Sequence, residues 1–349
     1  MHLESYFVLP PTLRREQNQL DYKRNILHID IQIRQQLKEI LILFSCPPYT
    51  SINIAIFITY CVFSSISIIY ILVFMKEIIS FASDFGLEDG SVGVVKGVIN
   101  RVDSDLKIND ISHGIPPQNI KYGSLLLMRA IQYIPQGVLL AVVDPGVGTE
   151  RNPIAITTDW GLMIGPDNGL LNLACATVGG AKQAFLLENE NWIIPHEGET
   201  FHARDIFAPF AAAYASGQLK LEEFGKELDL EDLTQYLIPL TDISDKEIKG
   251  EVLYVDHFGN CQTNVSPDEL KDKNFQIGDV LSLTIGNQEI KAKWCETYQN
   301  DNDREVGIVV DSWGMVSLFV SNGSASQVLD CKDSSKVKIK VENSKLKVR

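Results

Sequence analysis

Short apolar runs alternate with amphipathic segments through the middle of the chain. Residues 78–82, 138–143 and 154–157 are almost uninterrupted apolar stretches, which is typical of strands buried on both faces. Between them, residues 90–102 and 122–134 repeat apolar side chains at helical spacing. Strands that alternate with helices predict a mixed or parallel sheet covered on both faces, an α/β/α sandwich.

The pattern changes near residue 239. A polar segment, 239–249, is expected to be a linker, and short alternating strands follow it at small intervals. These strands are expected at Gly250–Asp256, Val280–Ile285, Gln288–Trp294, Gly307–Val310, Val316–Val320 and near Val337–Val341. They predict a small antiparallel barrel or sandwich, of which the barrel is favoured. We therefore expect an α/β domain at 75–238 and a smaller β-barrel domain at 250–349.

The first 74 residues follow a third pattern. Residues 52–74 carry no charged side chain, and a run of this length can cross a bilayer about 30 Å thick. The first expected strand follows Met75 almost at once, without a linker. Two explanations are open: a start codon placed too early, with the working chain beginning at Met75, or a genuine membrane anchor. The first is favoured. A signal peptide is not, because the apolar run starts too late.

Composition narrows the classes of function. With 45% hydrophobic and 22% charged residues, the 349-residue chain has the composition of an ordinary folded protein. Its formal net charge of −14 argues against a nucleic-acid partner, which needs a basic face. The cysteines show neither CxxC nor zinc-type spacing, so we expect a reducing compartment, no disulfide framework and no metal. They are Cys46, Cys61, Cys175, Cys261, Cys295 and Cys331.

Turns at the ends of the predicted strands carry the candidate chemistry. Asp144 follows an apolar strand, enters a Pro-Gly-x-Gly turn and lies seven residues before Arg151. His202 lies in another charged segment, before an alanine-rich helix. Together with similar turns at 80–90 and 165–171, they predict one site assembled from several loops, where open α/β sheets bind ligands. Each also has an ordinary explanation: Asp144 and Arg151 could close a surface turn, and His202 could cap its helix.

Six motifs make the chain similar to a known family. They are SDFGLEDGSVGVVKGVI, DISHGIPPQNI, VVDPGVGTER, GPDNGLL, TFHARDIFAP and HFGNCQTN, in the family's order and spacing. From about Met75 to Leu329 the chain thus resembles the S-adenosylmethionine hydroxide adenosyltransferases, adenosine-forming hydrolases related to the fluorinating and chlorinating enzymes. The resemblance implies hydrolysis of S-adenosylmethionine to adenosine and methionine, with no cofactor. It also implies a homotrimer, with each site between one subunit's first domain and a neighbour's second.

The resemblance identifies Asp144, Arg151 and His202 as a catalytic triad. His202 would accept or relay the proton of the attacking water, because an imidazole titrates near neutral pH. Asp144 would assist by orientation or by sharing the proton, and Arg151 would keep Asp144 ionised and stabilise the developing hydroxide. The halogenating relatives differ at the aspartate and histidine positions, so hydrolysis is favoured. Because S-adenosylmethionine is made and kept in the cytoplasm, we expect the enzyme there.

The first domain holds two further candidates for substrate contacts. Asp84 could accept hydrogen bonds from both ribose hydroxyls, since two carboxylate oxygens match a cis-diol. Asp89 could bind the methionine ammonium group. Arg204 and Asp205 are expected to form an ion pair that supports the loop of His202.

The second domain holds the remaining candidates. Phe258 could stack on adenine and Asn260 could read its edge, although Phe258 could equally be a core aromatic. Ser312 resembles the family's serine that meets the methionine carboxylate. Val320 and Asn322 fall where the family's backbone groups contact adenine. The family usually carries a glutamate near Ser317 and, in the first domain, a glycine at Ala203.

Two other functions are open from the sequence. One is halide-dependent cleavage of S-adenosylmethionine, which a tyrosine in place of Asp144 would have supported. The other is a non-catalytic nucleotide-binding protein anchored in a membrane through residues 52–74, which requires that the first 74 residues are present in the protein.

Overall fold

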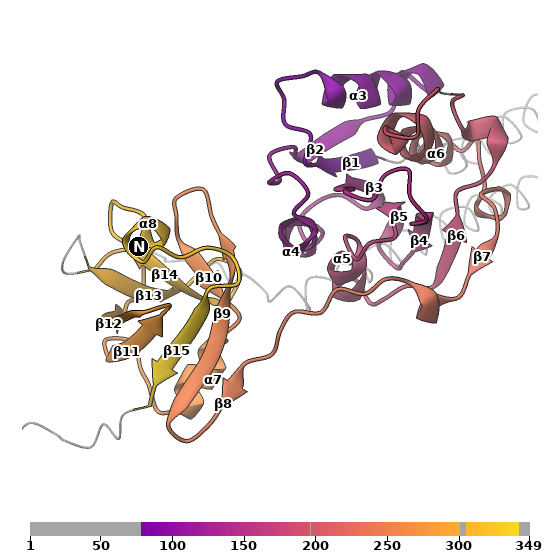
Figure 1. Ribbon diagram of the computed structural model, residues 1–349. Coiled ribbons are helices and arrows are strands. Elements are labelled where there is room, and N and C mark those ends of the chain that lie inside the picture. Colours follow the sequence, from indigo (N-terminus) through magenta and orange to yellow (C-terminus); the bar gives the residue numbers. More distant parts are fainter. Residues whose placement is uncertain (1–77, 196, 301–304, 342–349) are drawn as a thin grey trace, which may run out of the picture. The chain divides into compact units, whose positions relative to one another are not determined.

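The computed structural model describes residues 78–195, 197–300 and 305–341 (Figure 1). The expectations about the start codon and about residues 52–74 lie outside these residues. Within the described part of the chain, no helix combines the length and apolar character needed to cross a membrane.

The first domain is built on a seven-stranded mixed sheet with the order β2-β1-β3-β5-β4-β6-β7. The parallel strands are β2 (Ile108–Ser112), β1 (Ile78–Ser83), β3 (Gly137–Val142) and β5 (Gly161–Pro166). The antiparallel strands are β4 (Pro153–Thr157), β6 (Gln183–Leu186) and β7 (Glu227–Leu228). Strand β1 pairs with β2 on one side and β3 on the other, so nothing upstream is needed to complete its pairing.

Helices cover both faces of this sheet, as Figure 1 shows. Helices α3 (Ser91–Val102) and α6 (Ala208–Ala215) pack on one face, and α4 (Ile120–Ala130) and α5 (Asn172–Thr177) on the other. Successive residues of β3 enter the two cores in turn, because side chains alternate along a strand. Short 3₁₀ turns occupy Glu190–Trp192, Leu221–Glu223 and Leu230–Asp232. The expected α/β/α sandwich is confirmed.

The second domain is a closed seven-stranded β-barrel. Around the barrel the strands are β10 (Cys261–Thr263), β14 (Val316–Val320), β13 (Val306–Val310), β12 (Gln288–Trp294), β11 (Val280–Ile285), β15 (Lys336–Lys340) and β9 (Glu247–Val255). Strand β10 pairs with both β14 and β9, which closes the barrel. Helices α7 (Pro267–Asp272) and α8 (Ala325–Val328) complete the domain.

Two details of the barrel differ from the expectation. Strands β12 and β13 run parallel, so a purely antiparallel barrel is wrong at this pair; the segment between them, 295–305, is too long for a tight hairpin. The expected linker 239–249 is also partly strand. Strand β9 begins at Glu247, where it pairs with β15, and the short β8 (Asp242–Ile243) pairs with β9 in turn.

Candidate active site

Three loops of the first domain bring Asp144, Arg151 and His202 into contact. Asp144 follows β3, Arg151 precedes β4, and His202 precedes a π-helical segment, Ala203–Phe207, that continues into α6. Arg151 Nε donates to Asp144 Oδ1 at 2.9 Å, and Arg151 Nη2 donates to Asp144 Oδ2. The same Nη2 lies 2.8 Å from His202 Nδ1. The structure thus places the three side chains together, and their catalytic roles stay predictions.

These hydrogen bonds define the tautomer of His202. A guanidinium can only donate, so Nδ1 must accept, and a neutral imidazole then carries its proton on Nε2. His202 Nε2 lies 3.4 Å from Oε2 of Glu199, which can receive that proton's hydrogen bond. The sequence reasoning did not find Glu199, although it lies three residues before the histidine. In this state both ring nitrogens of His202 already have partners.

One nitrogen of the Arg151 guanidinium, Nη1, makes no hydrogen bond among the described residues. The guanidinium carbon lies 5.3 Å from the centre of the Phe207 ring, at the distance of a cation–π contact. Nη1 is also buried. Because a buried unpaired donor costs about 1–3 kcal/mol, one that persists beside a charged cluster is a candidate for ligand binding. Nη1 of Arg151 is therefore a candidate donor to an anionic or developing anionic oxygen.

Asp84 and Asp89 lie on the segment between β1 and α3. Asp84 Oδ2 accepts a hydrogen bond from the Gln118 backbone N–H at 2.7 Å, which fixes the carboxylate against the segment before α4. Asp89 accepts from the Ser91 backbone N–H at 2.9 Å, and this bond lowers the pKa of Asp89 below its usual value. The Asp84 segment also reaches the histidine segment, because the rings of Phe85 and Phe201 meet edge to face, 5.8 Å apart.

The expected ion pair between Arg204 and Asp205 forms in the π-helical segment that follows His202. Arg204 Nε and Nη2 donate to the two oxygens of Asp205 at 2.6 and 2.8 Å, and Asp205 is completely buried. This bidentate contact raises the pKa of Arg204. Ala203, where the family usually has glycine, is buried beside it. Arg204 thus pairs with Asp205, whereas Arg151 pairs with Asp144 and His202.

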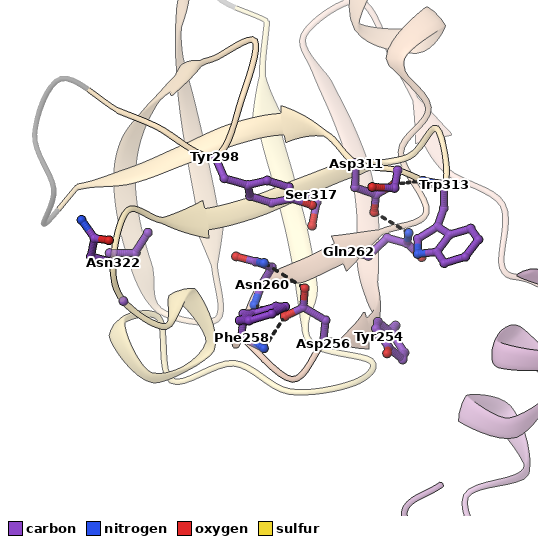
Figure 2. A pocket seen from close by; sticks show the side chains of 13 residues that line it. Tyr254, Asp256, Phe258, Asn260, Gln262, Tyr298, Asp311, Trp313, Ser317 and Asn322 are labelled. Atoms are coloured by element: carbon purple, nitrogen blue, oxygen red, sulfur yellow. Dashed lines mark hydrogen bonds between the residues drawn. The ribbon is translucent and has the colours of Figure 1, made fainter. Parts of the chain in front are cut away.

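The five residues expected to bind substrate in the second domain line one cavity of about 640 Å³ (Figure 2). They are Phe258, Asn260, Ser312, Val320 and Asn322. The other lining residues are Tyr254, Asp256, Gln262, Tyr298, Asp311, Trp313, Ser317 and Gly323. Phe258 is 74% exposed, so its interpretation as a core aromatic is wrong. The lining belongs to the second domain alone and does not include Asp84, Asp89 or the triad.

Two aspartates that the sequence reasoning missed shape this cavity. Asp256 accepts from the backbone N–H groups of Phe258 and Asn260 at 2.9 and 2.8 Å, and from the Asn260 side-chain amide at 2.8 Å. Asp311 accepts from the backbone N–H groups of Trp313 and Met315 at 2.9 and 3.1 Å. Both belong to an Asp-x-aromatic-Gly sequence, the pattern of a turn that begins at aspartate and ends at glycine. This repeated sequence pattern was the signal from which the two aspartates could have been predicted.

Fold and site together define a class of protein. An α/β/α sandwich with a buried, charged triad on its loops is joined to a barrel with a small-molecule cavity, which is the organisation of a two-domain α/β enzyme. The chain belongs to the SAM hydroxide adenosyltransferase family. The family's N-terminal domain matches residues 79–225 and its C-terminal domain matches residues 250–338. The resemblance drawn from the six motifs is confirmed.

Individual relatives agree with this assignment. The (R)-S-adenosyl-L-methionine hydrolase of Salinispora tropica is 38% identical over 251 residues, covering 72% of this chain and 93% of that protein. The fluorinase of Actinopolyspora mzabensis is 24% identical over 296 residues, covering 76% and 98%. The crystal structure of an uncharacterized conserved protein from Thermotoga maritima has 34% identity and a TM-score of 0.69, covering 75% of this chain and 99% of that one.

Proposed function

We propose that the protein hydrolyses S-adenosyl-L-methionine to adenosine and L-methionine. The observation that carries the proposal is the direct contact of Asp144, Arg151 and His202, in a family whose hydrolase members are 31–38% identical to this chain. In the reaction, the oxygen of water forms a bond to C5′ while the C5′–S bond breaks. The electron pair of that bond stays on sulfur, which becomes the neutral thioether of methionine. One water proton must be removed.

The main difficulty lies in the nucleophile. A sulfonium leaves without an acid or a Lewis acid, so we propose that the reaction needs neither a metal nor a cofactor. Neutral water must instead be held in line with the C5′–S bond, and such orientation can supply about 7–11 kcal/mol in favourable cases. A pocket poor in water also favours the transition state, because the charge on sulfur disperses as the bond breaks.

The hydrogen bonds within the triad suggest which residue accepts the proton and which stabilises the negative charge. Arg151 uses one lone pair on each oxygen of Asp144, so the carboxylate keeps lone pairs that can orient water and receive its proton. The unused Nη1 of Arg151 can donate to the water oxygen as negative charge develops. Nδ1 of His202 is already engaged by Arg151, so a transfer to the imidazole requires that contact to open first. We therefore propose Asp144 as the first proton acceptor, with His202 as the relay.

The substrate would span both domains. Asp84 would bind the ribose diol and Asp89 the ammonium group of methionine. In the cavity, Phe258 would stack on adenine and Asn260 would read its edge. The remaining contacts are the methionine carboxylate at Ser312 and adenine at the backbone of Val320 and Asn322.

We propose that the working form is a homotrimer, with each site between one subunit's first domain and a neighbour's second. The support is that the cavity is lined by second-domain residues only, whereas the triad belongs to the first domain. The second domain of another copy of the chain could supply the cavity that completes the site of each triad. Sedimentation of the purified protein, with and without substrate, measures this directly.

We also propose that the enzyme acts in the cytoplasm, where its substrate is made, and that residues 1–74 are dispensable. A protein that begins at Met75 should be soluble, with activity per mole no lower than that of the full chain, because β1 already pairs on both sides. Peptides from residues 4–38 in a membrane fraction of the native cell would instead support the anchored alternative.

A product assay tests the proposed function. Purified protein is incubated with S-adenosylmethionine, with and without chloride or fluoride, and the nucleosides are separated by chromatography. Adenosine and methionine should appear in equal amounts at a rate independent of halide. Incubation in ¹⁸O-labelled water should place the label on the 5′ oxygen. A halogenated nucleoside, or no nucleoside, contradicts hydrolysis.

A further inference from the structure

Arg129 is a buried cation on α4 that contacts the second domain. Its side chain is 5% exposed, and its Nη2 donates to Oε1 of Gln262. The guanidinium carbon lies 4.3 Å from the centre of the Tyr254 ring and 5.6 Å from that of Trp313. The ion pairs found among the described residues do not include Arg129. Burying a charge without a carboxylate partner costs free energy, so its presence here calls for an explanation.

The partners of Arg129 point to an explanation. Tyr254, Gln262 and Trp313 all line the cavity of the second domain (Figure 2). Gln262 Nε2 donates to Oδ2 of Asp311 at 2.5 Å, and the other oxygen of Asp311 accepts from the backbone of the turn that carries Ser312. A continuous path of hydrogen bonds therefore leads from the first domain to this turn.

The amide of Gln262 is held in one orientation by opposite charges. Its carbonyl faces the guanidinium of Arg129 and its NH₂ group faces the carboxylate of Asp311. Gln262 is 3% exposed, so water cannot easily replace either partner. Without Arg129 the carbonyl loses its donor, so only the hydrogen bond to Asp311 still orients the amide. The turn at 311–315 would then be held by a less restrained side chain.

We propose that Arg129 is a positioning residue for substrate binding, which holds the turn at 311–315 so that Ser312 meets the carboxylate of the amino-acid part. The inference deepens the proposed function and rests on it. Phe258 and Asn260, which we propose contact adenine, are held separately by Asp256 and its own turn. Loss of Arg129 should therefore weaken recognition of the amino-acid part and leave recognition of the nucleoside almost unchanged.

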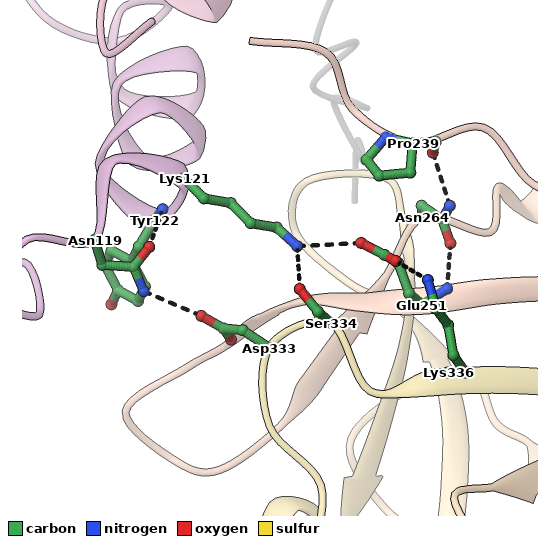
Figure 3. A network of polar contacts seen from close by, with 9 residues as sticks. All are labelled: Asn119, Lys121, Tyr122, Pro239, Glu251, Asn264, Asp333, Ser334 and Lys336. Carbon is green, nitrogen blue, oxygen red and sulfur yellow. Dashed lines mark hydrogen bonds and ion pairs between the residues drawn. The ribbon is translucent and has the colours of Figure 1, made fainter. Parts of the chain in front are cut away.

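Lys121 offers a matched control on the same helix. Its Nζ lies 3.2 Å from Oε1 of Glu251 and 3.1 Å from Oγ of Ser334, so it also joins α4 to the second domain (Figure 3). Neither of these partners lines the cavity. Lys121→Met removes a cation that joins the same helix to the second domain, and it leaves the hydrogen bonds of Arg129, Gln262 and Asp311 in place.

The test compares two ligands that are not turned over. S-adenosylhomocysteine has the amino-acid part but a neutral thioether, and adenosine lacks that part. Calorimetric titration of the full-length protein measures both affinities. Arg129→Met should weaken the binding of S-adenosylhomocysteine at least about tenfold and the binding of adenosine less than about twofold. Lys121→Met should change neither by more than about twofold. Thermal unfolding checks the fold of each variant. If Arg129→Met does not fold, Arg129→Lys should show the same selective loss, because a lysine keeps the charge but not the planar donor group.

If Arg129→Met weakens the binding of both ligands equally, Arg129 serves general domain packing and the inference is overturned. The inference is also overturned if Lys121→Met shows the same selective loss of affinity, or if Arg129→Met loses no affinity. These outcomes are separate from failure of the proposed function. If the proposed function fails, wild-type protein will bind S-adenosylhomocysteine but release no adenosine from S-adenosylmethionine.

Discussion

Arg151→Ala should lower the turnover of S-adenosylmethionine at least about a hundredfold, the size expected when a preorganised charged donor is removed. Arg151 contacts both other members of the triad, so its loss also frees Asp144 and His202 to move. Asp144→Asn and His202→Ala should each lower turnover by a similar factor, because general-base contributions are about 10²–10⁴. Single-turnover rates at saturating enzyme, followed as adenosine release, measure the effect of all three substitutions.

Stability must be measured beside the rate. The Asp144 and Arg151 side chains are 6% and 9% exposed, so Arg151→Ala leaves a nearly buried carboxylate without its cation. Breaking such a pair destabilises a protein by about 3–5 kcal/mol, whereas Asp144→Asn keeps the shape and loses only the charge. Urea unfolding of each variant shows whether enough folded protein is present at the assay temperature.

Arg204→Ala is the matched control for Arg151→Ala. Both substitutions remove an arginine that is paired with an aspartate, but Arg204 contacts Asp205 and does not contact the triad. Arg204→Ala should lower stability with a rate per folded molecule within about threefold of wild type. Near-wild-type turnover in folded Arg151→Ala, or equal losses in both variants, would remove the triad from the proposed mechanism.

The first domain could be predicted closely from the sequence, because its strands are buried on both faces. Strand β3 was expected at 138–143 and is found at Gly137–Val142, where all six residues are buried. Burial of a whole strand leaves a continuous apolar run, which is a strong signal in a single sequence. The same burial explains why the position of Asp144 at the strand end could be recognised.

Polar segments explain what the sequence could not predict. Strand β9 begins at Glu247 because Lys340 and Lys338 of β15 pair with it, and no local pattern in Glu-Ile-Lys-Gly reveals a partner about ninety residues away. The parallel pairing of β12 with β13 is likewise a property of the closed barrel. Alternation of side chains is the same in parallel and antiparallel strands, so periodicity carries no information on direction.

The site shows the same division. The residues proposed to contact the substrate were predicted through motifs. Four residues that form hydrogen bonds to these side chains or to their turns were not predicted: Glu199, Asp256, Asp311 and Arg129. Aspartates in turns and arginines on helices are common on protein surfaces, and their role depends on which backbone groups they meet after folding. The hydrogen bonds supply that information.

Asp84→Ala should weaken binding of the substrate by at least about a hundredfold, with a much smaller effect on the rate of the bound complex. Each hydrogen bond to a charged acceptor contributes about 1.5–3 kcal/mol, and two ribose hydroxyls would be affected. The substitution also removes the acceptor of the Gln118 backbone N–H, so the segment before α4 loses one tether. Binding of S-adenosylhomocysteine, which is not turned over, gives the affinity without interference from turnover.

A comparison of ligands separates the ribose contact from the tether. In wild-type protein, the 2′-deoxy analogue of S-adenosylhomocysteine should bind at least about tenfold more weakly than the ribose form, because one charged hydrogen bond is missing. In Asp84→Ala the two ligands should bind within about twofold of each other. Asp89→Ala, from the same segment, should weaken both ligands and preserve their ratio. If the deoxy analogue is penalised equally in wild type and Asp84→Ala, Asp84 does not contact the ribose and its carboxylate serves only to hold Gln118.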